Sequence, residues 1–184
     1  MKRPYIAILI LSLTALLACH SKRKIYQLYK MDEFNLSEGY RFVEKIQYLP
    51  SIQEISIVDT KADGNDFVVN GQWIFLDTTK QDQPNYYSVK KRADELNVNA
   101  DSLSNCLMSF YKIGVNDFNR DSDFYRFGVV VGFTTNRGYL YIDKDKIKSG
   151  DTLPSTSVRN TDYHFKVVLT KQLDKKWFEY YETR

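Results

Sequence analysis

Histidine and cysteine are scarce in this chain, whose 184 residues include only two of each. His20 directly follows one of the cysteines near the N-terminus, where it could hardly serve a folded site. His164 is therefore the only candidate for a histidine base or a histidine metal ligand. One usable histidine and one free cysteine cannot build a tetrahedral zinc site without several carboxylates. We accordingly expect neither a metal nor a cofactor.

Motifs of common enzyme classes are also missing, because there is no G-x-S-x-G elbow, no G-x-G-x-x-G turn and no Walker loop. Acidic residues crowd two turns, at 59–66 and 143–151, but their spacing misses that of a calcium loop. His164 falls on the polar face of a predicted strand, as an exposed strand histidine would. We expect a protein that is not an enzyme. A cryptic hydrolase using His164 or a carboxylate pair stays open, because such groups come together in space.

Long apolar runs are absent except for one, which extends from Tyr5 to Leu17 after Lys2 and Arg3. A positive start, a short apolar stretch and a small residue form the order of a secretory signal. The run is shorter than the about 20 apolar residues that a transmembrane helix needs. We therefore predict that residues 1–18 are a signal peptide.

The sequence Leu16-Leu17-Ala18-Cys19 spans the end of the predicted signal and the residue that follows it. This tetrapeptide resembles the lipobox of bacterial lipoproteins. The resemblance implies that the Cys19 thiol is diacylated, that the chain is cut before it, and that residues 19–30 form a tether to the membrane. The residue after Cys19 is His20 and not an aspartate. This favours a location in the outer membrane, facing the periplasm. A plain secreted protein and an uncleaved anchor are the alternatives.

The positive charge of the chain belongs to its N-terminal end. The formal net charge is +3, but Lys2 and Arg3 leave with the signal, and three more basic residues lie in the tether at 22–24. The remaining body is near −2. A basic isoelectric point of this origin does not indicate a nucleic-acid partner.

Residues 31–184 are expected to form one α+β domain, with a mostly antiparallel sheet of about six or seven strands packed with about three helices. Asn35 and Glu38 have the spacing of a capping box before the first helix. Asp63-Gly64 and Asn70-Gly71 predict hairpin turns. Helices are predicted over 36–46, 86–96 and 101–113, and strands over 52–60, 66–69, 72–76, 125–133, 139–142, 163–169 and 177–181. Cys106 lies in the apolar stripe of the third helix, so we expect a buried thiol and no internal disulfide.

Two features predict a binding face. Gly128 and Gly132 flank Val130 on the strand face opposite the apolar row, where a partner could approach closely. Tyr139 and Tyr141 follow on the next strand, and tyrosine is enriched at interfaces. The alternatives are that the helices of the chain cover the glycines, that a bulge lies there, and that tyrosine reflects ordinary strand propensity.

These observations together predict a lipid-anchored bacterial envelope protein that binds another protein without catalysing a reaction. Inhibitors and immunity-type proteins of the periplasm are examples of similar size and location. Its partners would be the membrane, through acylated Cys19, and a protein of unknown identity. A glycan-binding lipoprotein that uses aromatic strand faces is the main alternative.

Overall fold

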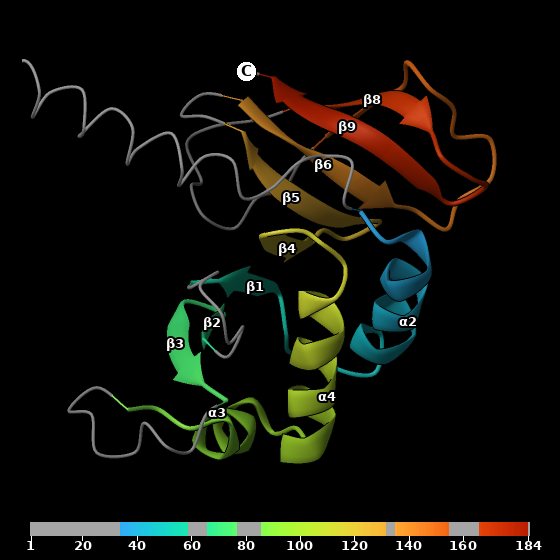
Figure 1. The fold of residues 1–184 in the computed structure, drawn as a ribbon. Helices are drawn as coiled ribbons and strands as arrows, with labels where there is room; N and C mark the ends of the chain where they lie inside the picture. The colour runs from blue at the N-terminus through green and yellow to red at the C-terminus, as the bar shows by residue number, and fades with distance from the viewer. Residues whose placement is uncertain (1–33, 59–65, 77–85, 132–134, 155–165, 184) are drawn as a thin grey trace, which may run out of the picture.

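The computed structural model describes residues 34–58, 66–76, 86–131, 135–154 and 166–183. These residues form three helices and a single sheet of nine strands (Figure 1). The helices are α2 (Leu36–Ile46), α3 (Val89–Leu96) and α4 (Ala100–Tyr111). The strands are β1 (Glu54–Ile57), β2 (Asp66–Val69), β3 (Gln72–Phe75), β4 (Asp117–Arg120), β5 (Tyr125–Val131), β6 (Thr135–Tyr141), β7 (Thr152–Pro154), β8 (Lys166–Gln172) and β9 (Trp177–Thr183).

The strands are arranged in the order β3-β2-β1-β4-β5-β6-β9-β8-β7, and every neighbouring pair is antiparallel. Asn70 and Gly71 connect β2 to β3 with φ angles of 46° and 78°. Two consecutive positive φ angles are what a two-residue hairpin turn of type I′ requires. The predicted Asn70-Gly71 turn is therefore confirmed, whereas Asp63-Gly64 lies outside the described residues.

The α+β class and the antiparallel sheet are confirmed, but the predicted strand count is wrong. The two strands without a counterpart in the prediction are β4 and β7. In β4 only Phe118 is buried, between polar neighbours, so there is no apolar alternation to detect. β7 is a three-residue edge strand that ends in Pro154, inside a stretch predicted to be a loop. Both are strands because their neighbours in the sheet supply the hydrogen-bond partners.

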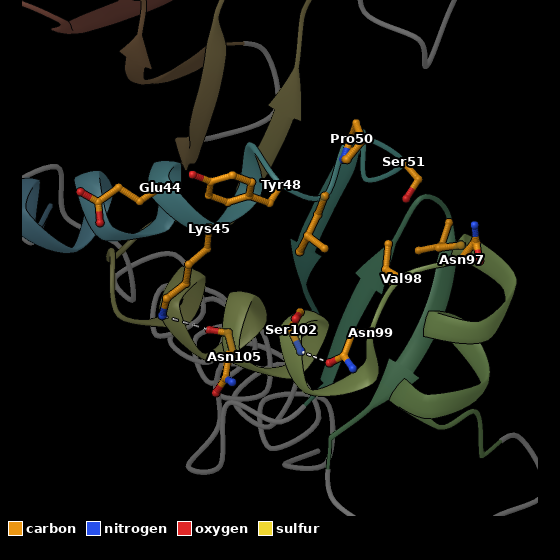
Figure 2. A pocket seen from close by; sticks show the side chains of 12 residues that line it. Glu44, Lys45, Tyr48, Pro50, Ser51, Asn97, Val98, Asn99, Ser102 and Asn105 are labelled. Atoms are coloured by element: carbon orange, nitrogen blue, oxygen red, sulfur yellow. Dashed lines mark hydrogen bonds between the residues drawn. The ribbon is translucent and has the colours of Figure 1, made fainter.

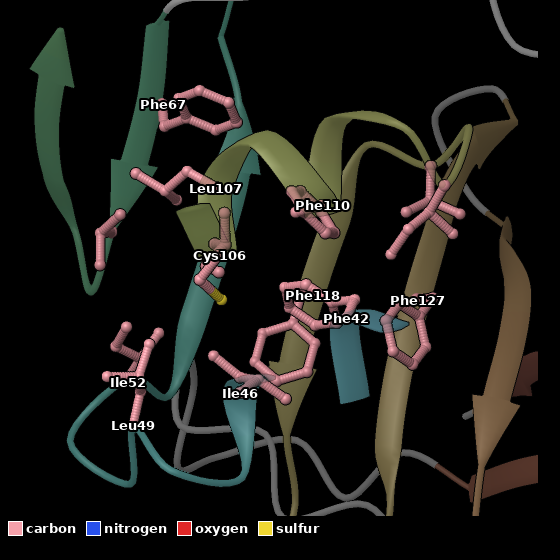
Figure 3. Packing of buried hydrophobic residues seen from close by; sticks show 14 of the residues in the cluster. Phe42, Ile46, Leu49, Ile52, Phe67, Cys106, Leu107, Phe110, Phe118 and Phe127 are labelled. Carbon is pink, nitrogen blue, oxygen red and sulfur yellow. The ribbon is translucent and has the colours of Figure 1, made fainter. Parts of the chain in front are cut away.

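The three helices and one face of the sheet enclose the larger core (Figure 3). The Phe42 ring of α2 lies 5.1 Å from the ring of Phe118 and 5.3 Å from that of Phe110 on α4. Cys106 is fully buried in this core, as the helical stripe predicts. α2 and α4 lie side by side in Figure 1 and together cover β1, β4 and β5 on this face.

A smaller core lies on the opposite face, under the last strands. Successive residues of a strand point to opposite faces, so β9 contributes Trp177 to the larger core and Phe178 to the smaller one. The smaller core consists of Phe124, Leu140, Ile142, Val167, Leu169, Phe178 and Tyr180. Strands β6 and β9 thus belong to both cores.

One arginine connects the end of α2 to β4. Arg120 donates through Nη2 to the carbonyl oxygens of Ile46 at 2.6 Å and Leu49 at 3.2 Å. Its Nε donates to the carbonyl of Ile52 at 2.9 Å, and its Nη1 lies 3.1 Å from the Tyr125 hydroxyl. A helix end leaves carbonyl groups without partners inside the helix. Arg120 supplies those partners and fixes the loop that follows the helix.

Replacing Arg120 with methionine is expected to lower the free energy of unfolding by about 2–3 kcal/mol, because half-buried carbonyl groups lose a charged donor. Urea denaturation of the purified protein measures this change. Arg120→Lys is the matched control, which keeps the charge but loses the planar fork, so it should recover only part of the loss. A change of less than about 0.5 kcal/mol in the methionine variant would show that the carbonyl groups find other partners.

Candidate functional site

The predicted tyrosines lie on the helix-covered face of the sheet. Tyr139 is 3% exposed, and its ring stacks on that of Phe34 with 3.7 Å between centroids. Tyr141 is half-buried, and its ring centroid lies 5.4 Å from that of Trp177 in an edge-to-face arrangement. Tyr139 pairs directly with Phe127 of the apolar row, which places it on that row's face. Its side chain is therefore part of the core and offers no surface to a partner.

Gly128 lies on the other face of the sheet from Tyr139. A Cβ atom added to Gly128 would lie 3.3 Å from the Cβ of Asp117, so a neighbouring side chain already borders this position. Val130 pairs through its backbone with Asn136, and Gly132 lies outside the described residues, as do Cys19 and His164. The structure therefore does not bring the predicted residues together on one surface.

Metal-ligating side chains do not cluster in the part of the chain that the structure describes. No group of three or more histidine, cysteine or acidic side chains there could hold a metal ion. Cys106 is the free cysteine of this part, and burial raises the pKa of its thiol to about 12, against the opposing effects of Lys45 and Arg120. A thiol of this kind is inert, because the thiolate is the reactive form.

The Cys106 thiol is expected to be unreactive toward a water-soluble disulfide reagent at pH 8 in the folded protein, and reactive once urea unfolds the chain. The raised pKa of this thiol also predicts how the free energy of unfolding changes with pH. The contribution of the neutral thiol is fully present below the unfolded pKa of about 8.5 and is lost as pH rises toward 12. Peptide mapping of the labelled protein checks the reactivity, and rapid labelling of Cys106 without denaturant would contradict it.

A groove of about 760 Å³ lies between the end of α2 and the connection from α3 to α4 (Figure 2). Its volume falls in the range of about 300–1,000 Å³ that is typical of ligand pockets. One wall is the loop from Tyr48 to Ser51, and the other is the segment from Leu96 to Asn99 with the first turns of α4. We treat this groove as the candidate functional site.

Local sequence signals shape both walls. Asn97 ends α3 in the left-handed conformation with φ 54°, which asparagine tolerates better than most residues. Two residues later Asn99 caps α4, and its side-chain oxygen accepts the Ser102 N–H at 2.9 Å. On the opposite wall, the N–H of Leu49 donates to the carbonyl of Ile46 as α2 ends. The loop after α2 and the connection from α3 to α4 therefore lie on opposite walls of the groove.

Neutral polar side chains dominate the lining, and an apolar floor lies beneath them. The neutral polar residues are Tyr48, Ser51, Asn97, Asn99, Ser102 and Asn105. The floor consists of buried Leu49 and half-buried Leu96 and Val98, and exposed Pro50 adds a fourth aliphatic side chain. Glu44 and Lys45 add one charge of each sign, and the Lys45 ammonium lies 3.5 Å from the backbone oxygen of Asn105. Such a lining donates and accepts hydrogen bonds with little net charge.

Three large apolar side chains are exposed on the loop after α2 and on α4. Tyr48 is 78% exposed, Met108 is 39% exposed and Tyr111 is 37% exposed. Met108 lies one helical turn beyond the groove residue Asn105 on α4. Sequence reasoning missed this surface. The available signal was Tyr48, a large aromatic residue that falls outside the apolar stripe ending at Ile46.

Comparison with protein-family models, curated proteins and solved structures found no match for this chain. The described residues also contain no helix that is both long and apolar enough to cross a membrane.

Proposed function

We propose that this is a lipid-anchored envelope protein that binds another protein without catalysing a reaction, in the manner of an inhibitor or immunity-type protein. The groove between α2 and the α3–α4 connection, with Tyr48 almost fully exposed at its edge, is the observation that carries the proposal. The anchor is Cys19 at the end of the signal. The membrane leaflet would be the periplasmic side of the outer membrane.

The composition of this surface supports a protein partner. Tyrosine and methionine are enriched in protein interfaces, and tyrosine buries a large area at a small entropic cost. Tyr48 supplies such area on the loop after α2, and Met108 and Tyr111 supply it on α4, and both elements are packed into the larger core. A concave centre with an apolar floor and a polar rim fits the anatomy of specific interfaces.

The anchor has its own test. Cys19→Ser should abolish the incorporation of labelled fatty acid into the protein, because the acylated thiol is gone. Cys106→Ser is the matched control, since Cys106 is buried in the core and should leave the labelling unchanged. Labelling that persists in the Cys19→Ser protein would refute the anchor.

Photo-crosslinking in cells tests the protein partner. A photoreactive amino acid replaces Tyr48, Met108 or Tyr111 in the full chain, and Lys90 of α3 serves as the control, because its side chain is 78% exposed and does not line the groove. We expect one protein adduct from the first three positions and none from Lys90. The absence of any protein adduct from all three positions would refute the proposal, as would an identical adduct pattern from Lys90.

Glycan binding is a second candidate, favoured by an aromatic row at the edge strand β3. Trp73 is 48% exposed and stacks on Phe75 at 5.8 Å, and Phe75 stacks on Tyr86 at 5.8 Å. Exposed aromatic faces can stack on the apolar faces of sugar rings. This candidate predicts saturable binding of soluble oligosaccharides that Trp73→Ala abolishes while Tyr48→Ala preserves it.

A further inference from the structure

We infer that the groove receives an extended, uncharged segment of the partner's polypeptide, whose main chain is bound by asparagine carboxamides and whose aliphatic side chain enters the apolar floor. This inference rests on the proposed function, because it assumes that the partner is a protein. It specifies which part of the partner is recognised and by which side chains.

Three asparagine side chains line the groove, and their carboxamides resemble peptide groups. A carboxamide donates and accepts hydrogen bonds as a peptide group does, so it can pair with a main chain whatever the sequence. Within the described residues, the side chains of Asn97 and Asn105 form no hydrogen bond, although both line the groove. Asn99 uses its oxygen to cap α4, which leaves its NH₂ group for a carbonyl oxygen of a ligand. Three asparagines therefore offer donors or acceptors to one ligand.

A buried hydroxyl group also supports a ligand that offers main-chain hydrogen bonds. The Oγ atom of Ser51 is buried and has no hydrogen-bond partner among the residues that the structure describes. Figure 2 shows its side chain on the wall of the groove that faces Val98. A buried polar group without a partner costs free energy. A ligand main chain reaching this wall would satisfy the hydroxyl after a change of its rotamer.

The floor favours a peptide over a sugar. Leu49, which is 5% exposed, lies with half-buried Leu96 and Val98 beneath the polar rim, and Pro50 is exposed beside them. These aliphatic side chains fit an aliphatic side chain of a ligand, whose burial contributes about 25 cal/mol per Å². A sugar ring has no such side chain and is best bound by flat aromatic faces, of which this lining holds only that of Tyr48.

The few charged residues of the lining argue against a charged segment of the partner. Glu44 and Lys45 are consecutive residues of opposite sign on α2, and the other residues of the lining are neutral. A phosphorylated or strongly acidic segment would need a cluster of basic side chains. A basic segment would need several carboxylates. Neither occurs in this lining, so an uncharged segment fits best.

The test selects peptides on the full chain in detergent micelles. A displayed library of random linear peptides is bound to the protein, and peptides that also bind empty detergent micelles are removed. We expect the remaining peptides to lack charged residues and to share one aliphatic position. A synthetic peptide of this set should bind Asn105→Ala at least about tenfold more weakly, since a hydrogen bond to a buried polar group is lost. Gln47→Ala removes an exposed carboxamide of α2 outside the groove and should leave the affinity unchanged.

N-methylation of single peptide bonds in that peptide identifies the main-chain contact. At one bond, methylation should weaken binding to the parent protein and have a much smaller effect on the Asn105→Ala protein, because both changes remove the same interaction. The inference is overturned if no peptide is enriched, if charged peptides dominate, if Asn105→Ala and Gln47→Ala behave alike, or if every methylation effect is additive. A cross-linked partner at Tyr48 together with any of these results would leave the proposed function standing and remove only the inference.

Discussion

Replacing Arg126 with methionine is expected to lower the free energy of unfolding by about 3–5 kcal/mol, the cost of leaving buried charges without their partner. Arg126 is 5% exposed on the face of the smaller core. Its Nε lies 2.6 Å from the Asp121 carboxylate, and its Nη1 pairs with the Glu182 carboxylate. Burial lowers the pKa of Arg126, but Asp121, Tyr180 and Glu182 outweigh that effect and raise it. The guanidinium is thus held in its charged form.

The stability of the Arg126→Met protein is measured by urea denaturation against the parent protein. A triple variant that combines it with Asp121→Asn and Glu182→Gln is the informative control, because it removes the buried negative charges as well. We expect this variant to recover a large part of the lost stability, since a buried ion cluster contributes little more than a neutral replacement. A loss below about 1 kcal/mol for Arg126→Met alone would mean that water reaches the two carboxylates.

The second large effect is expected at Gly138, where alanine should destabilise the protein by about 4 kcal/mol or more, an exceptional value for one added methyl group. A Cβ atom at Gly138 would lie 1.9 Å from the backbone oxygen of Phe127 on β5. Backbone in the middle of a sheet cannot yield by the required distance without breaking the ladder between β5 and β6. Overpacking of a flexible side chain would cost less.

Gly128 provides the matched control for this prediction, because it pairs directly with Gly138 across the same two strands. Its added Cβ atom would meet the Cβ of Asp117 at 3.3 Å, a contact that a small shift relieves. The Gly128→Ala protein should stay within about 1 kcal/mol of the parent, since alanine also lowers the entropy of the unfolded chain. Thermal unfolding of both variants decides the matter, and equal losses would contradict the steric explanation.

Elements built from local signals could be predicted from the sequence. Helix α2 begins after Asn35, whose side chain accepts the Glu38 N–H at 3.2 Å, as the capping pattern predicts. The Asn70-Gly71 turn is another case, because its conformation depends on two adjacent residues. The predicted α3 and α4 are found with shifted ends, at Val89 and Tyr111, where helix boundaries depend on the cap that forms.

Elements that depend on distant partners could not be predicted. The strand predicted over 139–142 is longer in the structure, where β6 begins at Thr135 because its backbone pairs with β5 up to Val131. The groove is a similar case. Tyr48 and Asn99 are far apart in the sequence, and no periodicity relates a loop after one helix to the cap of another. Tyr139 was expected to be at a surface, but the pairing with Phe127 places it in the core.

The position of β9 has a consequence for the order in which the chain can fold. β9 lies between β6 and β8, and Trp177 and Phe178 complete both cores from opposite faces. A chain that has emerged only as far as β7 lacks the Trp177 ring of the larger core and four of the seven buried residues of the smaller one, Val167, Leu169, Phe178 and Tyr180, so the smaller core closes only after β8 and β9 arrive. Contacts between residues so distant in sequence also form late. The half of the sheet that carries the smaller core is therefore completed last along the chain, whereas the residues of the larger core, Trp177 excepted, are already present.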